Sequence, residues 1–199
     1  MEMLRKTRNF APAKRPRMSK TQLKKELSAL SHDQLVELIL EAYSARKEVK
    51  EYFEYFLAPD ENRLMEKFRK EVTKELSRTR RGGYSKARIS VLKRLIGDFE
   101  SFQPSLSSKV DFMMFIFALG VDGELRLWYP PALEKGLEWI MLRAVDMAED
   151  NEDAGRILPL VDAVLTADGY AHRAFRRNLA ESLRERVSRI RLDRRNVKQ

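Results

Sequence analysis

The chain has 199 residues, of which 43% are hydrophobic and 35% charged, and this length is sufficient for a buried core. It has no cysteine, which excludes disulfides, thiolate metal sites and a cysteine nucleophile. Its net charge of +9 comes from the two ends, because residues 1–17 carry +5, residues 173–199 carry +7 and residues 18–172 carry −3. The longest apolar run, Phe112–Leu119, is too short to cross a bilayer, so we predict a cytoplasmic protein.

Residues 1–17 show no apolar period and contain Pro12 and Pro16, so we predict a disordered basic arm. Met18 is an alternative start of the protein, in which case the arm is an upstream extension. We predict a single helical domain over residues 18–192 and a disordered tail over residues 193–199.

The first helices are predicted from their start signals. Ser19 with Gln22, and Ser31 with Gln34, have the spacing of capping boxes, and each pair precedes leucines at intervals of three and four. An aromatic-rich helix follows and ends before Pro59. Asp60 is then expected to cap a helix whose apolar residues recur every four positions up to residue 76.

The middle of the chain is predicted to contain the core. After a basic break at residues 78–88, Ser85 is expected to cap a helix running to about residue 99. Pro104 then opens an element in which residues 112–119 are apolar on every side, as in the most buried helix of a bundle. Gly120 and Gly123 are expected to end it.

Three more helices complete the prediction. Tyr129-Pro-Pro leads into one helix, and Pro159 lies near the start of a shorter one. The last helix has an inner face that consists of Phe175, Leu179, Leu183, Val187 and Ile190. No segment alternates with period two, so we predict an all-α, compact bundle of eight or nine helices.

Several stretches resemble a known family: Leu23-Lys-Lys-Glu-Leu27, Leu30–Tyr43, Val49-Lys-Glu-Tyr-Phe53 and Gly83–Arg88. They are similar to an uncharacterised family of bacterial proteins, mainly from Bacteroidetes, known only as a domain of unknown function. The resemblance covers about residues 18–121 and implies a compact helical protein that starts at the equivalent of Met18. It implies no activity, cofactor or catalytic residue, and the Arg-rich last helix departs from the family.

The basic break is the first candidate site. It carries five cations and no acid: Arg78, Arg80, Arg81, Lys86 and Arg88. Gly82 and Gly83 favour a tight turn, Ser85 is expected to cap the next helix, and the amides of residues 86–88 are expected to face an anion. We predict that the loop binds a phosphate of nucleic acid or of a small metabolite. The alternative is a solvated loop that makes local ion pairs.

The last helix is the second candidate site. Arg176, Arg177 and Arg184, with further arginines, are predicted to line a phosphate backbone from the face opposite the apolar residues. The alternatives are a solubilising face or a contact with an anionic membrane surface. Trp128 and Trp139 are predicted to be packing residues rather than a platform on which bases stack.

Other polar residues do not form a recognisable chemical motif. His32 and His172 are predicted to be ordinary surface or capping residues, and neither has the spacing of a metal ligand. The acidic residues between 146 and 153 fail the pattern of a calcium loop. They are predicted to be a solvated helix end, or else an acidic contact for the chain's own basic tail or for a partner. No catalytic, metal-binding or cofactor-binding residue is predicted.

These patterns predict a non-enzymatic binding protein. Its partner is expected to be RNA, DNA or another polyanion, which would contact the basic ends and the loop at residues 78–88. The alternative is a helical scaffold for protein–protein interaction with no role in nucleic-acid binding, whose basic ends dock onto an acidic protein.

Overall fold

The computed structural model describes residues 18–124, 126–150, 154–166 and 173–197. This part of the chain contains nine helices and no strand, which confirms the all-α prediction. The chain divides into two compact units, Met1–Glu54 and Tyr55–Gln199, where the sequence predicted one domain over 18–192. The predicted arm over residues 1–17 lies outside the described residues.

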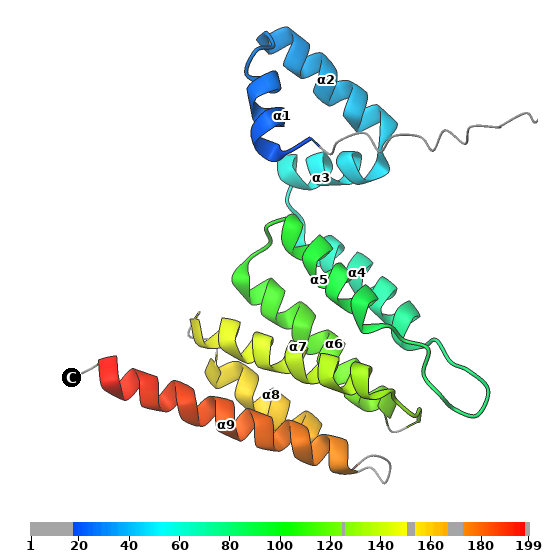
Figure 1. The fold of residues 1–199 in the computed structure, drawn as a ribbon, viewed down its shortest axis with the longest axis vertical. Helices are drawn as coiled ribbons and strands as arrows, with labels where there is room; N and C mark the ends of the chain where they lie inside the picture. Colours follow the sequence, from blue (N-terminus) through cyan, green and yellow to red (C-terminus); the bar gives the residue numbers. More distant parts are fainter. Residues whose placement is uncertain (1–17, 125, 151–153, 167–172, 198–199) are drawn as a thin grey trace, which may run out of the picture. The chain divides into compact units, whose positions relative to one another are not determined.

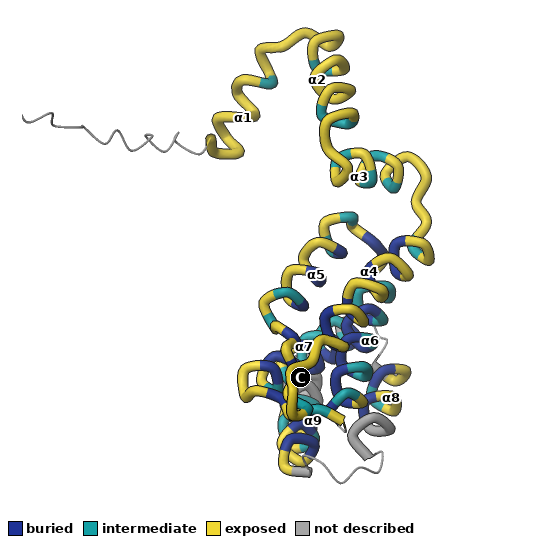
Figure 2. Tube along the Cα trace, turned by 90° about the vertical axis from the view of Figure 1, so that its right-hand side faces the viewer, coloured by how far each residue is buried: buried dark blue, intermediate teal, exposed yellow. Residues whose placement is uncertain are grey.

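The first unit contains α1 (Lys20–Leu27), α2 (His32–Ala45) and most of α3 (Lys47–Leu57). Both predicted capping boxes are confirmed, since Ser19 Oγ accepts from the Gln22 amide and Ser31 Oγ accepts from the Gln34 amide, each at 3.2 Å. None of the three helices contains a buried residue, as the absence of dark blue in Figure 2 shows. Their apolar side chains are therefore largely exposed.

The second unit contains the core, which is formed by six helices. They are α4 (Glu61–Leu76), α5 (Ile89–Ser101), α6 (Leu106–Glu124), α7 (Pro131–Asp150), α8 (Ala154–Thr166) and α9 (Arg173–Val197). The pair α6 and α7 is central, with α4 and α5 packed on one side and α8 and α9 on the other (Figure 1). Phe112, Ile116 and Phe117 of α6 are completely buried, as predicted for the helix that is apolar on all sides.

α6 does not end at Gly120 and Gly123, as the sequence predicted, but continues through both to Glu124. The two glycines permit close packing instead. A Cβ at Gly120 would lie 2.5 Å from the Leu137 side chain, and one at Gly123 would lie 2.4 Å from the Tyr129 hydroxyl. That hydroxyl donates a hydrogen bond to the Gly120 carbonyl at 2.7 Å, so the glycines fix the approach of the segment that follows α6.

The two helices at the C-terminal end also differ from the prediction in their bounds. α8 begins at Ala154, so that Pro159 lies inside it. α9 continues to Val197, whereas the sequence predicted a disordered tail over residues 193–199. No Pro or Gly interrupts α9 before Val197, so nothing in its sequence stops the helix. Phe175, Leu179 and Leu183 form its buried face, as predicted. No helix within the described ranges is both long and apolar enough to cross a membrane.

Truncation of the central helix is expected to be costly. Ile116→Ala removes a completely buried side chain and should lower the free energy of unfolding by about 2–5 kcal/mol. Leu160→Ala is the matched control, because Leu160 on α8 is half exposed and should change stability by about 0.5 kcal/mol or less. Urea titration measures both variants, and equal losses would contradict the central position of α6.

Candidate functional site

The basic loop, residues 78–88, connects α4 to α5 and folds back on itself as a hairpin (Figure 1). The Arg80 amide donates to the Tyr84 carbonyl at 2.7 Å, and the Lys86 amide donates to the Arg78 carbonyl at 2.8 Å. Gly82 and Gly83 form the tip with φ angles of +80° and +76°, a region that favours glycine. The predicted turn at the two glycines is thus present.

A segment from much later in the chain lies against this hairpin. The Trp128 amide donates to the Gly83 carbonyl at 2.8 Å, and the Trp128 carbonyl accepts from the Ser85 amide at 2.9 Å. These two bonds place Trp128 directly beside Tyr84 as a parallel β-bridge. Three short extended segments therefore lie side by side at residues 79–80, 84–85 and 128.

Side chains alternate between the two faces of these segments. On the inner face, Ser85 and Tyr129 are buried. On the outer face, Tyr84 is 58% exposed and Trp128 is 59% exposed, and Arg80 lies opposite Tyr84 in the hairpin. The prediction that Trp128 is a packing residue is wrong, because the bridge to Tyr84 turns its side chain to the surface. We call Arg80, Tyr84 and Trp128 the outer row.

Glu75, in the last turn of α4, is the acid that the sequence analysis overlooked. It is only 6% exposed and accepts hydrogen bonds from Arg78 Nη1 at 3.0 Å and from the Arg88 amide at 2.9 Å. Arg88 Nε also donates to it at 3.1 Å. Burial raises the pKa of Glu75, but the hydrogen bonds from Arg88 and Arg78 outweigh that effect and lower the pKa overall. Arg78 and Arg88 therefore have a fixed carboxylate partner, although both side chains remain exposed.

The predicted anion site at the start of α5 is wrong in its details. Ser85 does not cap α5, which begins at Ile89 after Arg88; its Oγ accepts from the Ala87 amide at 3.1 Å. The Lys86 and Arg88 amides donate to the Arg78 carbonyl and to Glu75. Since the amides of residues 86–88 all have partners inside the protein, they are not available to a phosphate.

All five predicted cations of the loop are at the surface, but only Arg78 and Arg88 are paired with Glu75. Arg80, Arg81 and Lys86 are exposed, and none of them forms an ion pair with a described residue. Arg80 belongs to the outer row. Lys86 lies on the same face of the hairpin, since it is two positions from Tyr84. Positive charge and two aromatic rings are thus brought to one surface of the second unit.

The predicted arginines of α9 fall into two groups. Arg177 and Arg184 are exposed, as expected for a contact surface. Arg176 is not, since it is 7% exposed and its Nε lies 3.5 Å from Oε2 of Glu124, which is completely buried at the end of α6. Its predicted role in nucleic-acid contact is therefore wrong, because position 176 is on the inner side of the helix next to Phe175.

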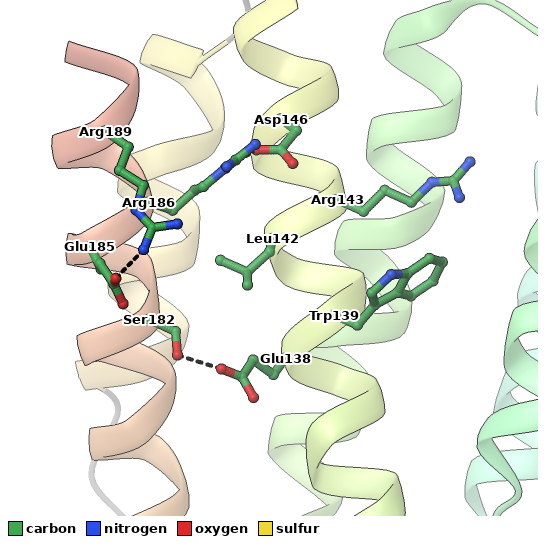
Figure 3. A pocket seen from close by; sticks show the side chains of 9 residues that line it. All are labelled: Glu138, Trp139, Leu142, Arg143, Asp146, Ser182, Glu185, Arg186 and Arg189. Atoms are coloured by element: carbon green, nitrogen blue, oxygen red, sulfur yellow. Dashed lines mark hydrogen bonds and ion pairs between the residues drawn. The ribbon is translucent and has the colours of Figure 1, made fainter. Parts of the chain in front are cut away.

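Further along α9, arginines pair with acids around a groove of about 610 Å³ between α7 and α9 (Figure 3). Arg186 Nε lies 2.5 Å from Asp146 Oδ1, and Arg189 pairs with Glu185. The Asp146 contact corresponds to the alternative that the acidic residues meet the chain's own basic helix. Because the charges that line it are paired, this groove offers a ligand neither a positive nor a negative surface.

The described residues offer no metal site, since none of their His, Asp and Glu side chains form a group of three with suitable positions. His32 is the first residue of α2, as predicted for a helix start, and His172 lies outside the described residues. Trp139 on α7 is 36% exposed, and Lys93 Nζ lies over its ring at 4.3 Å from the centroid.

Replacing Glu75 should destabilise the second unit in a pH-dependent way. Glu75→Gln is expected to lower the free energy of unfolding at neutral pH by about 1–3 kcal/mol, because a charged hydrogen-bond acceptor is lost. A lowered folded-state pKa stabilises the fold above the ordinary value of 4.5, and that contribution disappears as the pH falls through the folded-state pKa. The difference from wild type should therefore shrink as the pH falls below the ordinary value of 4.5 and through the lowered folded-state pKa.

Glu71→Gln, one turn earlier on the exposed side of α4, is the matched control and should have an effect of about 0.5 kcal/mol or less. Denaturant titrations at several pH values measure the free energy of unfolding of both variants. A pH-independent loss in Glu75→Gln would show that the carboxylate charge is not what matters.

Comparison with known proteins agrees with the predicted resemblance. A family described as a family of unknown function (DUF6155) matches residues 18–121. No curated protein and no solved structure matches the chain. The matched region includes the basic loop and Glu75, but it ends before Trp128 and α9. Since the match extends over more than half of the 199 residues, the chain belongs to this family of unknown function, DUF6155.

Proposed function

We propose that this protein is a non-enzymatic nucleic-acid-binding protein that contacts the phosphate backbone with its basic loop. The observation that supports this proposal most directly is the separation of cations within the loop. All five loop cations are exposed, but Arg78 and Arg88 are paired with Glu75, whereas Arg80, Arg81 and Lys86 form no ion pair with a described residue. Guanidinium groups form paired hydrogen bonds with phosphate oxygens, so this surface suits a polyphosphate chain.

The exposed arginines of α9 are a secondary contact in this proposal. Arg177 and Arg184 are on the outer side of α9, where neighbouring arginines are engaged with Asp146 and Glu185. Fewer cations of α9 are therefore available than its sequence suggests. The loop is the stronger candidate because the three cations that are not paired with Glu75 lie within seven residues.

Binding should depend on salt in proportion to the number of loop cations. If Arg80, Arg81 and Lys86 each neutralise one phosphate, the logarithm of the association constant should fall against the logarithm of salt concentration with a slope of about −2 for a single strand. Fluorescence anisotropy with a labelled oligonucleotide at several salt concentrations measures the slope. Absence of binding at low salt would refute the proposal.

Charge reversal locates the contact. Arg80→Glu/Arg81→Glu should weaken binding at least tenfold and make the salt slope shallower, since two phosphate contacts are lost. Lys24→Glu/Lys25→Glu on α1 is the matched control, because it changes the net charge equally at two exposed lysines of the first unit. A larger loss in Arg177→Glu/Arg184→Glu than in the loop variant would place the main contact on α9 instead.

The second candidate function is a helical scaffold for protein–protein interaction. It is favoured by the first unit, in which Leu38, Ile39 and Leu40 are 42%, 44% and 58% exposed on one helix. Large apolar side chains gathered in this way are typical of protein interfaces. Sedimentation over a range of concentrations tests self-association directly. Association that Leu38→Glu/Ile39→Glu abolishes, together with no binding of nucleic acid, would favour this alternative.

A further inference from the structure

The outer row combines two exposed aromatic rings with a cation on one surface. Tyr84 and Trp128 are neighbours in a parallel bridge, and residues paired in this way have their side chains on the same face. Neighbouring extended segments lie about 4.8 Å apart, so the two side chains start close together. Arg80 lies on the other side of Tyr84 and continues the row.

The backbone holds this arrangement independently of the two rings. Both main-chain hydrogen bonds of Trp128 go to the hairpin, to Gly83 and Ser85, at 2.8 and 2.9 Å. The inner-face neighbours Ser85 and Tyr129 are buried and anchor the segments to the second unit. More than half of each of Tyr84 and Trp128 is in contact with solvent. The backbone that carries them is nevertheless held in place before any ligand binds.

Flat aromatic rings beside cations match the chemistry of unpaired bases. In a duplex the faces of the bases are stacked on one another, and a protein reaches only their edges and the backbone. In a single strand the faces are accessible and stack on aromatic side chains, while cations contact the phosphates. An acidic peptide would form ion pairs with Arg80 and Arg81, but its carboxylates would not require two exposed aromatic rings.

We propose that Tyr84 and Trp128 form a stacking platform for the bases of single-stranded nucleic acid, with Arg80 and Arg81 contacting its phosphates. This inference rests on the proposed function and deepens it, because it names unpaired DNA or RNA as the ligand. The platform accepts any base, since every base has a flat face, so binding has little sequence preference.

Matched ligands separate stacking from charge. The probes are a labelled oligothymidylate of about twelve nucleotides, an abasic oligonucleotide of the same length and a duplex. Tyr84→Ala and Trp128→Ala should each weaken oligothymidylate binding by about 5-fold to 150-fold, and should leave binding of the abasic strand unchanged. Trp128→Phe should retain most of the affinity, because it keeps a flat ring. Thermal unfolding of each variant confirms that the fold is intact.

Tryptophan fluorescence gives an independent readout. The chain has two tryptophans, so Trp139→Phe leaves Trp128 as the only indole. Its emission should be quenched by oligothymidylate and not by the abasic strand or by heparin, which has charge but no bases. Quenching by all three would refute stacking.

The possible failures are distinguishable. If oligothymidylate and the abasic strand bind equally well, and only Arg80→Glu/Arg81→Glu weakens them, the proposed function holds and the platform is refuted. If neither binds at low salt, both proposals fail. If polyglutamate binds in place of the oligonucleotides and depends on Arg80 and Arg81, the partner is an acidic protein and the platform is again refuted.

Discussion

Burial of most of the apolar residues of α6 is the constraint from which the second unit follows. A helix this rich in apolar residues must be covered by other helices, and α4, α5, α7 and α8 pack against it. Gly120 and Gly123 allow Leu137 and Tyr129 to approach α6 more closely than any residue with a side chain would permit. Tyr129 in turn positions Trp128 beside the basic loop. The outer row is therefore supported by the same packing that forms the core.

Within this framework, Glu75 decides which charges of the loop are available. A carboxylate that is buried at the end of α4 requires cations and amide donors, and the loop supplies Arg78, Arg88 and the Arg88 amide. Arg176 is used in a similar way by Glu124 at the end of α6. In both places a buried acid gives an arginine of a basic segment a structural partner. Arg176 is buried by this pairing, whereas Arg78 and Arg88 remain exposed and are neutralised by Glu75.

The two units differ in how they use their apolar residues. In the second unit these residues form a continuous core, whereas in the helices of the first unit none is buried, and α1 and α2 each begin at a capping box. Capping stabilises a helix end by about 1 kcal/mol, which is small beside the burial of large side chains. The first unit therefore carries exposed apolar surface, and the second carries the basic loop and its aromatic pair. The exposed apolar surface of the first unit is consistent with binding a protein, and the basic loop of the second unit is consistent with binding nucleic acid.

The sequence by itself determined most of the helices, two capping boxes, the cap at Asp60 and the central position of α6. These features depend on residues within one or two helical turns of one another, so local spacing reveals them. The position of Glu75 is visible in the sequence, as a carboxylate in the last turn of α4 just before the basic loop. No local pattern indicates that this carboxylate is buried. Only the tertiary structure decided that Arg176 faces Glu124 and that Tyr84 lies beside Trp128, because these residues are 52 and 44 positions apart in the chain. Such pairs are set by the packing of whole helices around α6, for which no short-range pattern exists.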